Sequence, residues 1–322
     1  MRSPLRALVL FVALFAICAG LAAQVRVDVR LVNIIATVTD EAGRYVGNLT
    51  ADDFLVQEDG APQKISHFSQ DHDVPVSVGI ILDTSGSMER KIRTAVDAVD
   101  RFIRRTNEDD EIFLMTFSSE PMLRQDFTND RNKLSLALRK MWVTGATALY
   151  DAVNQGIEKI HFGRHEKRAI LVITDGQDTS SVAKLDEVLQ NIRQQEVLVY
   201  AIGISPTTGS QKTSFVPFNL PLPGILSGKS SVQNRRDDVD MKVLHAFAEN
   251  SGGRAFLLSE GFSRRGTEIE KVLTRVADEL RSQYTLGYYP PQPDDGRFHS
   301  IQIRTRTGHP VRARQGYIAS AS

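Results

Sequence analysis

The chain has 322 residues, enough for two compact domains or for one large domain with a smaller one. Hydrophobic residues make up 41% and charged residues 24%, as in ordinary soluble globular proteins, and 39 Lys and Arg balance 39 Asp and Glu. This balance excludes a general electrostatic attraction to nucleic acid or to anionic lipid, so we expect no nucleic-acid partner.

The first residues have the pattern of a secretory signal peptide. Arg2 and Arg6 lie in a short polar start, residues 7–17 are entirely apolar, and small residues follow up to Ala23. We therefore predict a signal peptide over residues 1–23. The alternative is a membrane anchor, but the apolar run is shorter than the ~20 residues of a spanning helix. We expect an exported protein, periplasmic or extracellular, with no membrane span after signal cleavage.

The only cysteine, Cys18, lies inside the predicted signal peptide. A lipoprotein would need a small residue directly before this cysteine, where Ile17 stands. Cleavage leaves a chain without cysteine, which excludes disulfide and thiol chemistry from the mature protein.

The segment that follows, residues 24–73, is predicted to form β-structure. Apolar and polar residues alternate over 25–38, with a change of phase near Leu31 that predicts a bulge. Turn signals occur at 40–43 and 58–60, each flanked by β-type residues.

Predicted strands and helices alternate over residues 74–283. Residues 74–82 form a nearly continuous apolar run, as in a strand covered on both faces, and 89–106 has apolar residues at helical spacing. The further predicted elements are strand 111–118, helices 132–141 and 148–160, strand 168–174, helix 185–195, strand 197–204, helix 241–250, strand 254–258 and helix 267–282. Repeated βα units predict an α/β fold with a doubly wound, mostly parallel sheet and helices on both faces.

Residues 284–322 return to β-structure. Strands are predicted at 284–289, 300–306 and 311–318, separated by strong turn signals. Because the ends of a domain commonly lie close together, we expect this segment to pair with 24–73 in one small β-domain. Two separate β appendages are the alternative.

Oxygen-bearing side chains stand where the first buried strand ends. Asp83, Ser85 and Ser87 close this strand and open a helix. In a doubly wound sheet, ligands bind beyond the carboxyl ends of the strands, and hard divalent cations such as Mg²⁺ prefer oxygen ligands. Taken alone, the motif could equally be a helix N-cap in a polar loop.

Two other segments strengthen the prediction of a metal site. Asp175 follows the strand 168–174, so it should reach the same edge of the sheet, and Thr147 lies in a loop after Gly145. The predicted metal site consists of Asp83, Ser85, Ser87, Thr147 and Asp175.

These five residues, in this order within 74–283, resemble the metal-ion-dependent adhesion site (MIDAS) of the von Willebrand factor A (VWA) family. The resemblance implies one Mg²⁺, with Mn²⁺ or Ca²⁺ as alternatives, bound directly by the serines and the threonine while the aspartates act largely through water. It also implies an open coordination position that takes an acidic side chain of the ligand. The flanks, including VTDEAGRYVGNLTADDFLVQEDGAPQKISHF, YTLGYYP and VRARQGYIA, resemble a group of exported bacterial proteins built around this domain.

The resemblance implies a non-enzymatic binding protein of the adhesion type, which recognises a protein or surface ligand presenting Asp or Glu. The alternative is a VWA subunit of a metal-dependent multiprotein complex or chelatase-like machine, disfavoured by the signal peptide and by the lack of a GxxxxGK[ST] loop. A hydrolase with Asp83 or Ser85 as nucleophile is less favoured still, because the serines lie in no GxSxG motif and no histidine is near.

Three further features of the sequence are weaker. His161 and His165 have a spacing that suits a metal on a helix, but without an HExxH glutamate we predict a surface pair. Asp178 either tunes the metal site or forms a turn. The loop 205–240, rich in Pro, Gly and Ser, is predicted to shape ligand access on the metal's face, with plain disorder as the alternative.

Overall fold

A computed structural model describes residues 31–70, 74–175, 177–205, 239–258, 267–291 and 295–319, and residues Leu31–Ser322 form one compact unit. The predicted signal peptide and nearly all of the 205–240 loop lie outside the described residues. None of the helices in the described part of the chain combines the length and the apolar character needed to cross a membrane.

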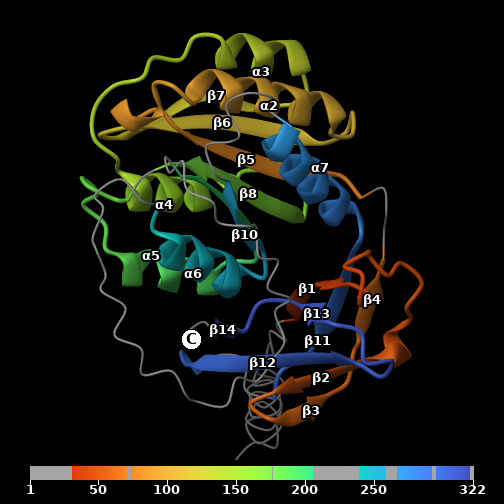
Figure 1. Ribbon diagram of the computed structural model, residues 1–322. Coiled ribbons are helices and arrows are strands. Elements are labelled where there is room, and N and C mark those ends of the chain that lie inside the picture. The colour runs from red at the N-terminus through yellow and green to blue at the C-terminus, as the bar shows by residue number, and fades with distance from the viewer. Residues whose placement is uncertain are drawn as a thin grey trace, which may run out of the picture. The chain divides into compact units, whose positions relative to one another are not determined.

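A six-stranded sheet forms the centre of the chain, with the strand order β10-β9-β8-β5-β6-β7 (Figure 1). Its strands are β5 (Val76–Asp83), β6 (Glu111–Phe117), β7 (Pro121–Thr128), β8 (Lys167–Thr174), β9 (Leu198–Ile204) and β10 (Arg254–Leu258). All neighbouring strands run parallel except β7, which is antiparallel to β6. Every residue of β5 is buried, as expected for a strand in the middle of a sheet that is covered on both faces.

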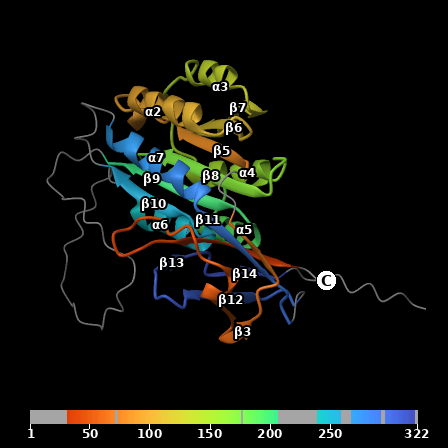
Figure 2. The same ribbon diagram turned by 90° about the vertical axis from the view of Figure 1, so that its right-hand side faces the viewer.

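Helices cover both faces of this sheet (Figures 1 and 2). One face carries α2 (Ile92–Arg105), α3 (Arg131–Leu138) and α7 (Thr267–Arg281), and the other carries α4 (Leu149–Ile160), α5 (Leu185–Gln194) and α6 (Met241–Ser251). Alternate residues of β5 serve the two cores: Ile80 and Leu82 pack with the first group, and Ile81 packs with the second. The predicted doubly wound α/β fold is confirmed.

Two details of this central region differ from the predicted elements. The sequence pattern does not predict β7, because it is an edge strand with exposed or half-buried side chains throughout and irregular pairing to β6. A strand of this kind lacks the apolar periodicity on which prediction depends. Helix α2 begins at Ile92 rather than near Glu89, because the 3-10 turn η2 (Gly86–Met88) comes first.

The strands near the two ends of the chain pair with one another in two further sheets. One has the order β13-β1-β11-β4 and the other β14-β12-β2-β3. Their elements are β1 (Val32–Val38), the 3-10 turn η1 (Ala51–Asp53), β2 (Phe54–Glu58), β3 (Ala61–Gln63), β4 (His67–Ser69), β11 (Gln283–Tyr288), β12 (Phe298–Thr305), β13 (Val311–Arg312) and β14 (Gly316–Ile318). Both sheets contribute to one core, which includes Ile34, Phe54, Tyr284 and Ile301.

The single strand predicted over 311–318 is in fact two. β13 pairs with β1 and β14 pairs with β12, so the chain crosses from one sheet to the other between them.

A buried carboxylate links these sheets to the central domain. Glu279, near the end of α7, is fully buried and accepts a hydrogen bond of 2.6 Å from the Tyr200 hydroxyl of β9. It also pairs with Arg312 of β13, and the Tyr45 hydroxyl lies 3.3 Å from its other oxygen. A buried acid is tolerated when it has such partners, and these come from both parts of the fold.

Candidate metal site

The candidate site lies where the sheet changes direction. β5 has β6 on one side and β8 on the other, and the connections that follow β5 and β8 lead to helices on opposite faces of the sheet, as at a topological switch point. Leu82 of β5 is level with Ile173 of β8. This register places Asp83 beside Thr174 and brings Asp175 to the same edge.

Asp83 is held firmly and without contact to solvent. One of its carboxylate oxygens, Oδ1, accepts a hydrogen bond of 2.7 Å from the Ser85 main-chain N–H, and Oδ2 accepts one of 2.6 Å from the Thr174 hydroxyl. Burial raises the pKa of Asp83 to about 6, and the nearby charge of Asp175 acts in the same direction. A carboxylate in such surroundings gains from a nearby cation.

The two serine hydroxyls have the spacing of neighbouring ligands around a small ion. Ser85 Oγ and Ser87 Oγ are 3.1 Å apart. Octahedral coordination at ~2.1 Å places adjacent oxygen ligands about 3.0 Å apart. Ser87 also donates a hydrogen bond of 2.7 Å to Asp175 Oδ1, so the Ser85 hydroxyl is the donor in the contact between the two serines. Ser85 is buried and Ser87 is exposed, so the pair opens outwards.

The loop that carries Thr147 is tied to these residues by main-chain hydrogen bonds. Thr144 N–H donates to Thr84 O over 2.9 Å, and Gly145 has a φ of 83°, a conformation that glycine adopts without strain. The main chain of Thr147 is bonded in both directions to Thr179. Its side chain is buried, and its hydroxyl forms no hydrogen bond with the described residues. The Thr147 hydroxyl could therefore bind a metal ion without first breaking a hydrogen bond to the described part of the protein.

One residue of the site was not found by sequence reasoning. Lys91 Nζ lies 2.6 Å from Asp175 Oδ2, and both side chains are buried. Its signal is slight: a lysine directly before the apolar stripe of α2. Lys91 neutralises one of two neighbouring carboxylates, so Asp83, Asp175 and Lys91 together carry a formal charge of about −1.

The set of donors fits a hard divalent cation. The structure links Asp83, Ser85, Ser87 and Asp175 through hydrogen bonds, and it anchors the Thr147 loop beside them. The donors are carboxylate and hydroxyl oxygens with no nitrogen or sulfur, which suits Mg²⁺, Mn²⁺ or Ca²⁺.

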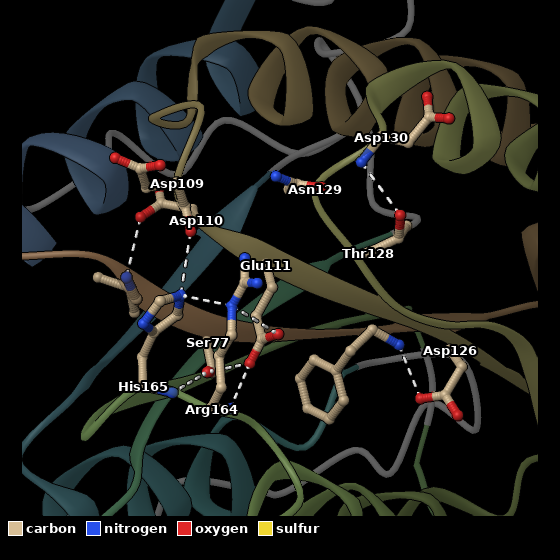
Figure 3. Close-up of polar contacts among 12 residues, drawn as sticks. Ser77, Asp109, Asp110, Glu111, Asp126, Thr128, Asn129, Asp130, Arg164 and His165 are labelled. Carbon is tan, nitrogen blue, oxygen red and sulfur yellow. Dashed lines mark hydrogen bonds and ion pairs between the residues drawn. The ribbon is translucent and has the colours of Figure 1, made fainter.

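The histidine pair is not placed as a helical metal site. Helix α4 ends at Ile160, so neither His161 nor His165 lies within it. His165 Nε2 is at hydrogen-bond distance, 3.0 Å, from the main-chain oxygen of Asp109 (Figure 3). The main-chain N–H of His165 donates to Ser77 Oγ, at the end of the sheet opposite to the candidate metal site.

Asp178 has a structural role in a turn. Its Oδ1 accepts hydrogen bonds from the Tyr150 N–H, in the first turn of α4, and from the Ser181 hydroxyl. Of the two expectations for this residue, the turn is the one that the contacts support.

Residues 78–177 match the family model of the von Willebrand factor type A domain, and this match together with the fold supports a VWA domain in the chain. A von Willebrand factor type A structure from Catenulispora acidiphila aligns with a TM-score of 0.50 and 11% identity, over 90% of this chain and 74% of that one. An aerotolerance-related membrane protein from Bacteroides fragilis aligns with a TM-score of 0.46 and 17% identity, over 64% and 98%. An uncharacterized protein of Borreliella burgdorferi is 25% identical over 211 residues, which are 62% of this chain and 58% of that relative's length.

Proposed function

We propose that this protein is an exported, non-enzymatic binding protein whose VWA domain holds one divalent cation and captures a protein or surface ligand through an Asp or Glu side chain. Ser85, Ser87 and Thr147 would hold the ion directly. Asp83 and Asp175 would support it, partly through water, because three of their four oxygens already accept protein hydrogen bonds and the fourth pairs with Lys91.

The 3.1 Å spacing of the Ser85 and Ser87 hydroxyls in front of two buried carboxylates is the observation that carries this proposal. Two acids placed together in the interior are unfavourable unless a positive charge balances them. Lys91 supplies one such charge and a bound divalent cation would supply the rest.

The charge balance favours an acidic ligand. With two carboxylates, one ammonium group and a divalent ion, the site would carry a net charge of about +1. A bound cation would offer a Lewis-acid position to an incoming oxygen. The exposure of Ser87 supports a position on the solvent side of the site.

Export is inferred from the signal pattern of residues 1–23, and it would place the ligand outside the cytoplasm.

The preferred ion follows from the oxygen donors. We propose Mg²⁺ before Mn²⁺ or Ca²⁺, because hydroxyl and water ligands in a compact shell suit the octahedral preference of Mg²⁺.

A pull-down from the native cell envelope tests the proposal. The protein would be immobilised as wild type, as Asp83→Asn and as Asp126→Asn, each with Mg²⁺ and with EDTA. Asp126 is the matched control, because its side chain is 60% exposed and lies on the edge strand β7. We expect partners on the wild type and on Asp126→Asn with Mg²⁺ only, and none on Asp83→Asn.

Partners retained equally in all arms would refute metal-dependent recognition. The non-enzymatic part is tested by the intact mass of a captured partner, which should not change during incubation with Mg²⁺. A shift in that mass, absent with Asp83→Asn, would instead indicate catalysis.

A further inference from the structure

A second group of side chains that could bind a metal belongs to the β14-β12-β2-β3 sheet, whose strands are labelled in Figure 1. β2 ends at Glu58, and the turn Asp59-Gly60 connects it to β3 with positive φ angles of 49° and 81°. His299 lies on the neighbouring strand β12. Glu58, Asp59 and His299 each offer one ligand atom, and these atoms lie within 4.8 Å of one another.

The imidazole of His299 is oriented from both sides. Its Nδ1 lies 2.8 Å from Asp59 Oδ2 and 3.8 Å from Glu58 Oε1, and its Nε2 lies 3.0 Å from Asp295 Oδ1. Tyr317 stacks on the ring with a centroid distance of 5.4 Å. A carboxylate on the far nitrogen is the usual support of a histidine that binds a metal through the other nitrogen.

The two acidic side chains are also held in place, and each keeps one oxygen directed at His299. Asp59 Oδ1 accepts hydrogen bonds from the Ser300 N–H and hydroxyl, which leaves Oδ2 for the imidazole. Glu58 Oε2 accepts hydrogen bonds from the Tyr288 and Tyr317 hydroxyls.

The second oxygen of Glu58, Oε1, lies on the side of His299. The Glu58 side chain is only 3% exposed, yet Oε1 forms no hydrogen bond with any described residue, and its nearest ionic partner is His299 Nδ1 at 3.8 Å. Three carboxylates, on Glu58, Asp59 and Asp295, surround the imidazole, and the charges of Arg297 and Arg314 lie nearby.

We propose that Glu58, Asp59 and His299 form a binding site for Zn²⁺ or a similar borderline transition metal, separate from the VWA domain. The distances of 2.8 and 3.8 Å from Nδ1 bracket the ~3.4 Å between ligands around a tetrahedral ion at ~2.1 Å. One nitrogen and two carboxylates are a ligand set for Zn²⁺ and differ from the all-oxygen set at the carboxyl ends of the central sheet. The Asp59 side chain is 52% exposed, which opens the fourth position to water.

Titration of the whole chain with Co²⁺ and Zn²⁺ tests this site. Excess Mg²⁺ would occupy the VWA site, and Co²⁺ would report a four- or five-coordinate environment through its visible absorption. We expect one tightly bound Zn²⁺ per chain in the wild type and in Asp83→Asn, and loss of saturable binding and of the Co²⁺ band in His299→Gln. Asp295→Asn, which removes only the support of the imidazole, should weaken Zn²⁺ binding about 10- to 100-fold.

Two further variants keep the test decisive. His245→Gln makes the same chemical change on an exposed histidine of α6 and should bind Zn²⁺ like the wild type. If His299→Gln fails to fold by circular dichroism, Asp59→Asn replaces it, because its change lies in an exposed turn and an amide oxygen can still accept from Ser300. The proposal is overturned if Zn²⁺ binding is absent, is unchanged without the His299 ligand, or is lost only in Asp83→Asn. The contacts of His299 would then be those of a structural ion-paired imidazolium.

Discussion

The two ends of the central sheet balance their buried acids differently. At the amino ends of β5 and β6, each buried acid is paired with a cationic side chain of the protein. At the carboxyl ends of β5 and β8 there are two buried acids, and the one lysine beside them pairs with Asp175 alone. In the first region, Glu111 accepts hydrogen bonds from the Ser77 hydroxyl and the Arg164 N–H and pairs with the Arg164 side chain (Figure 3). Asp110 accepts from two main-chain N–H groups and pairs with Arg281.

The second region has acids of similar burial but a different balance. Asp83 is fully buried and has only neutral hydrogen-bond donors, and Asp175 has the Ser87 hydroxyl and Lys91. The buried acids at the amino ends of the strands are thus balanced by cationic side chains, whereas the buried acids at the carboxyl ends are not fully balanced. The difference explains why we place the metal at the carboxyl ends.

Among the changes that test this difference, Lys91→Met should have the largest effect on the free energy of unfolding. Without divalent ions, the change leaves the buried Asp175 carboxylate beside Asp83 with no cation, which should lower the free energy of unfolding by about 3–5 kcal/mol. Mg²⁺ should recover most of this loss, since the ion supplies the missing charge. Denaturant unfolding with EDTA and with Mg²⁺ measures both quantities. A loss of equal size in both conditions would remove the basis for a cation at this end.

Asp83→Asn is expected to change how the stability of the metal-free protein depends on pH. Burial raises the pKa of Asp83 to about 6 from 3.8, so the metal-free folded chain binds this proton more tightly than the unfolded chain does. The resulting stabilisation is complete below pH 4 and is lost as the pH rises through 6. Metal-free Asp83→Asn should therefore gain in melting temperature relative to the wild type over this range, yet gain less from added Mg²⁺. Parallel pH curves for the two proteins would contradict the raised pKa.

Asp110→Ala is the corresponding change at the amino ends. The N–H groups of Val76 and Asn107 lose their acceptor, and the free energy of unfolding should fall by about 1–3 kcal/mol. Since this end is proposed to bind no metal, the loss should be the same with EDTA and with Mg²⁺. Recovery by Mg²⁺ would show that the two ends do not differ as described.

Arg164→Gln should have the smallest effect. The Arg164 side chain is 57% exposed, and Glu111 keeps its bonds to the Ser77 hydroxyl and to the main-chain N–H of residue 164. Exposed ion pairs contribute about 0–1 kcal/mol, so thermal unfolding should change little. A large loss would mean that the guanidinium, rather than these hydrogen bonds, balances Glu111.

Local patterns predicted most of the fold. The apolar run over β5 and the stripe of α2 reveal buried elements directly, whereas β7 shows no such pattern because its side chains are mostly not buried. The grouping of Asp83 and Asp175 was predictable as well, since parallel strands end at the same edge of a sheet.

The residues that sequence reasoning missed depend on contacts between distant segments. Lys91 is 84 positions from Asp175, and a single lysine before a helix has no recognisable signature. His299 is 240 positions from Asp59, and the turn that holds Asp59 reads only as a turn. These contacts arise from the pairing of β12 with β2 and from the position of β8 beside β5.

Anomalous diffraction from crystals of the protein soaked in Mn²⁺ tests the central claim most directly. We expect a manganese peak bounded by the hydroxyl oxygens of Ser85, Ser87 and Thr147, with Lys91 still paired to Asp175. A map with no peak at this position, while Ser87 and Asp175 keep their places, would contradict a metal site at the carboxyl ends of the sheet.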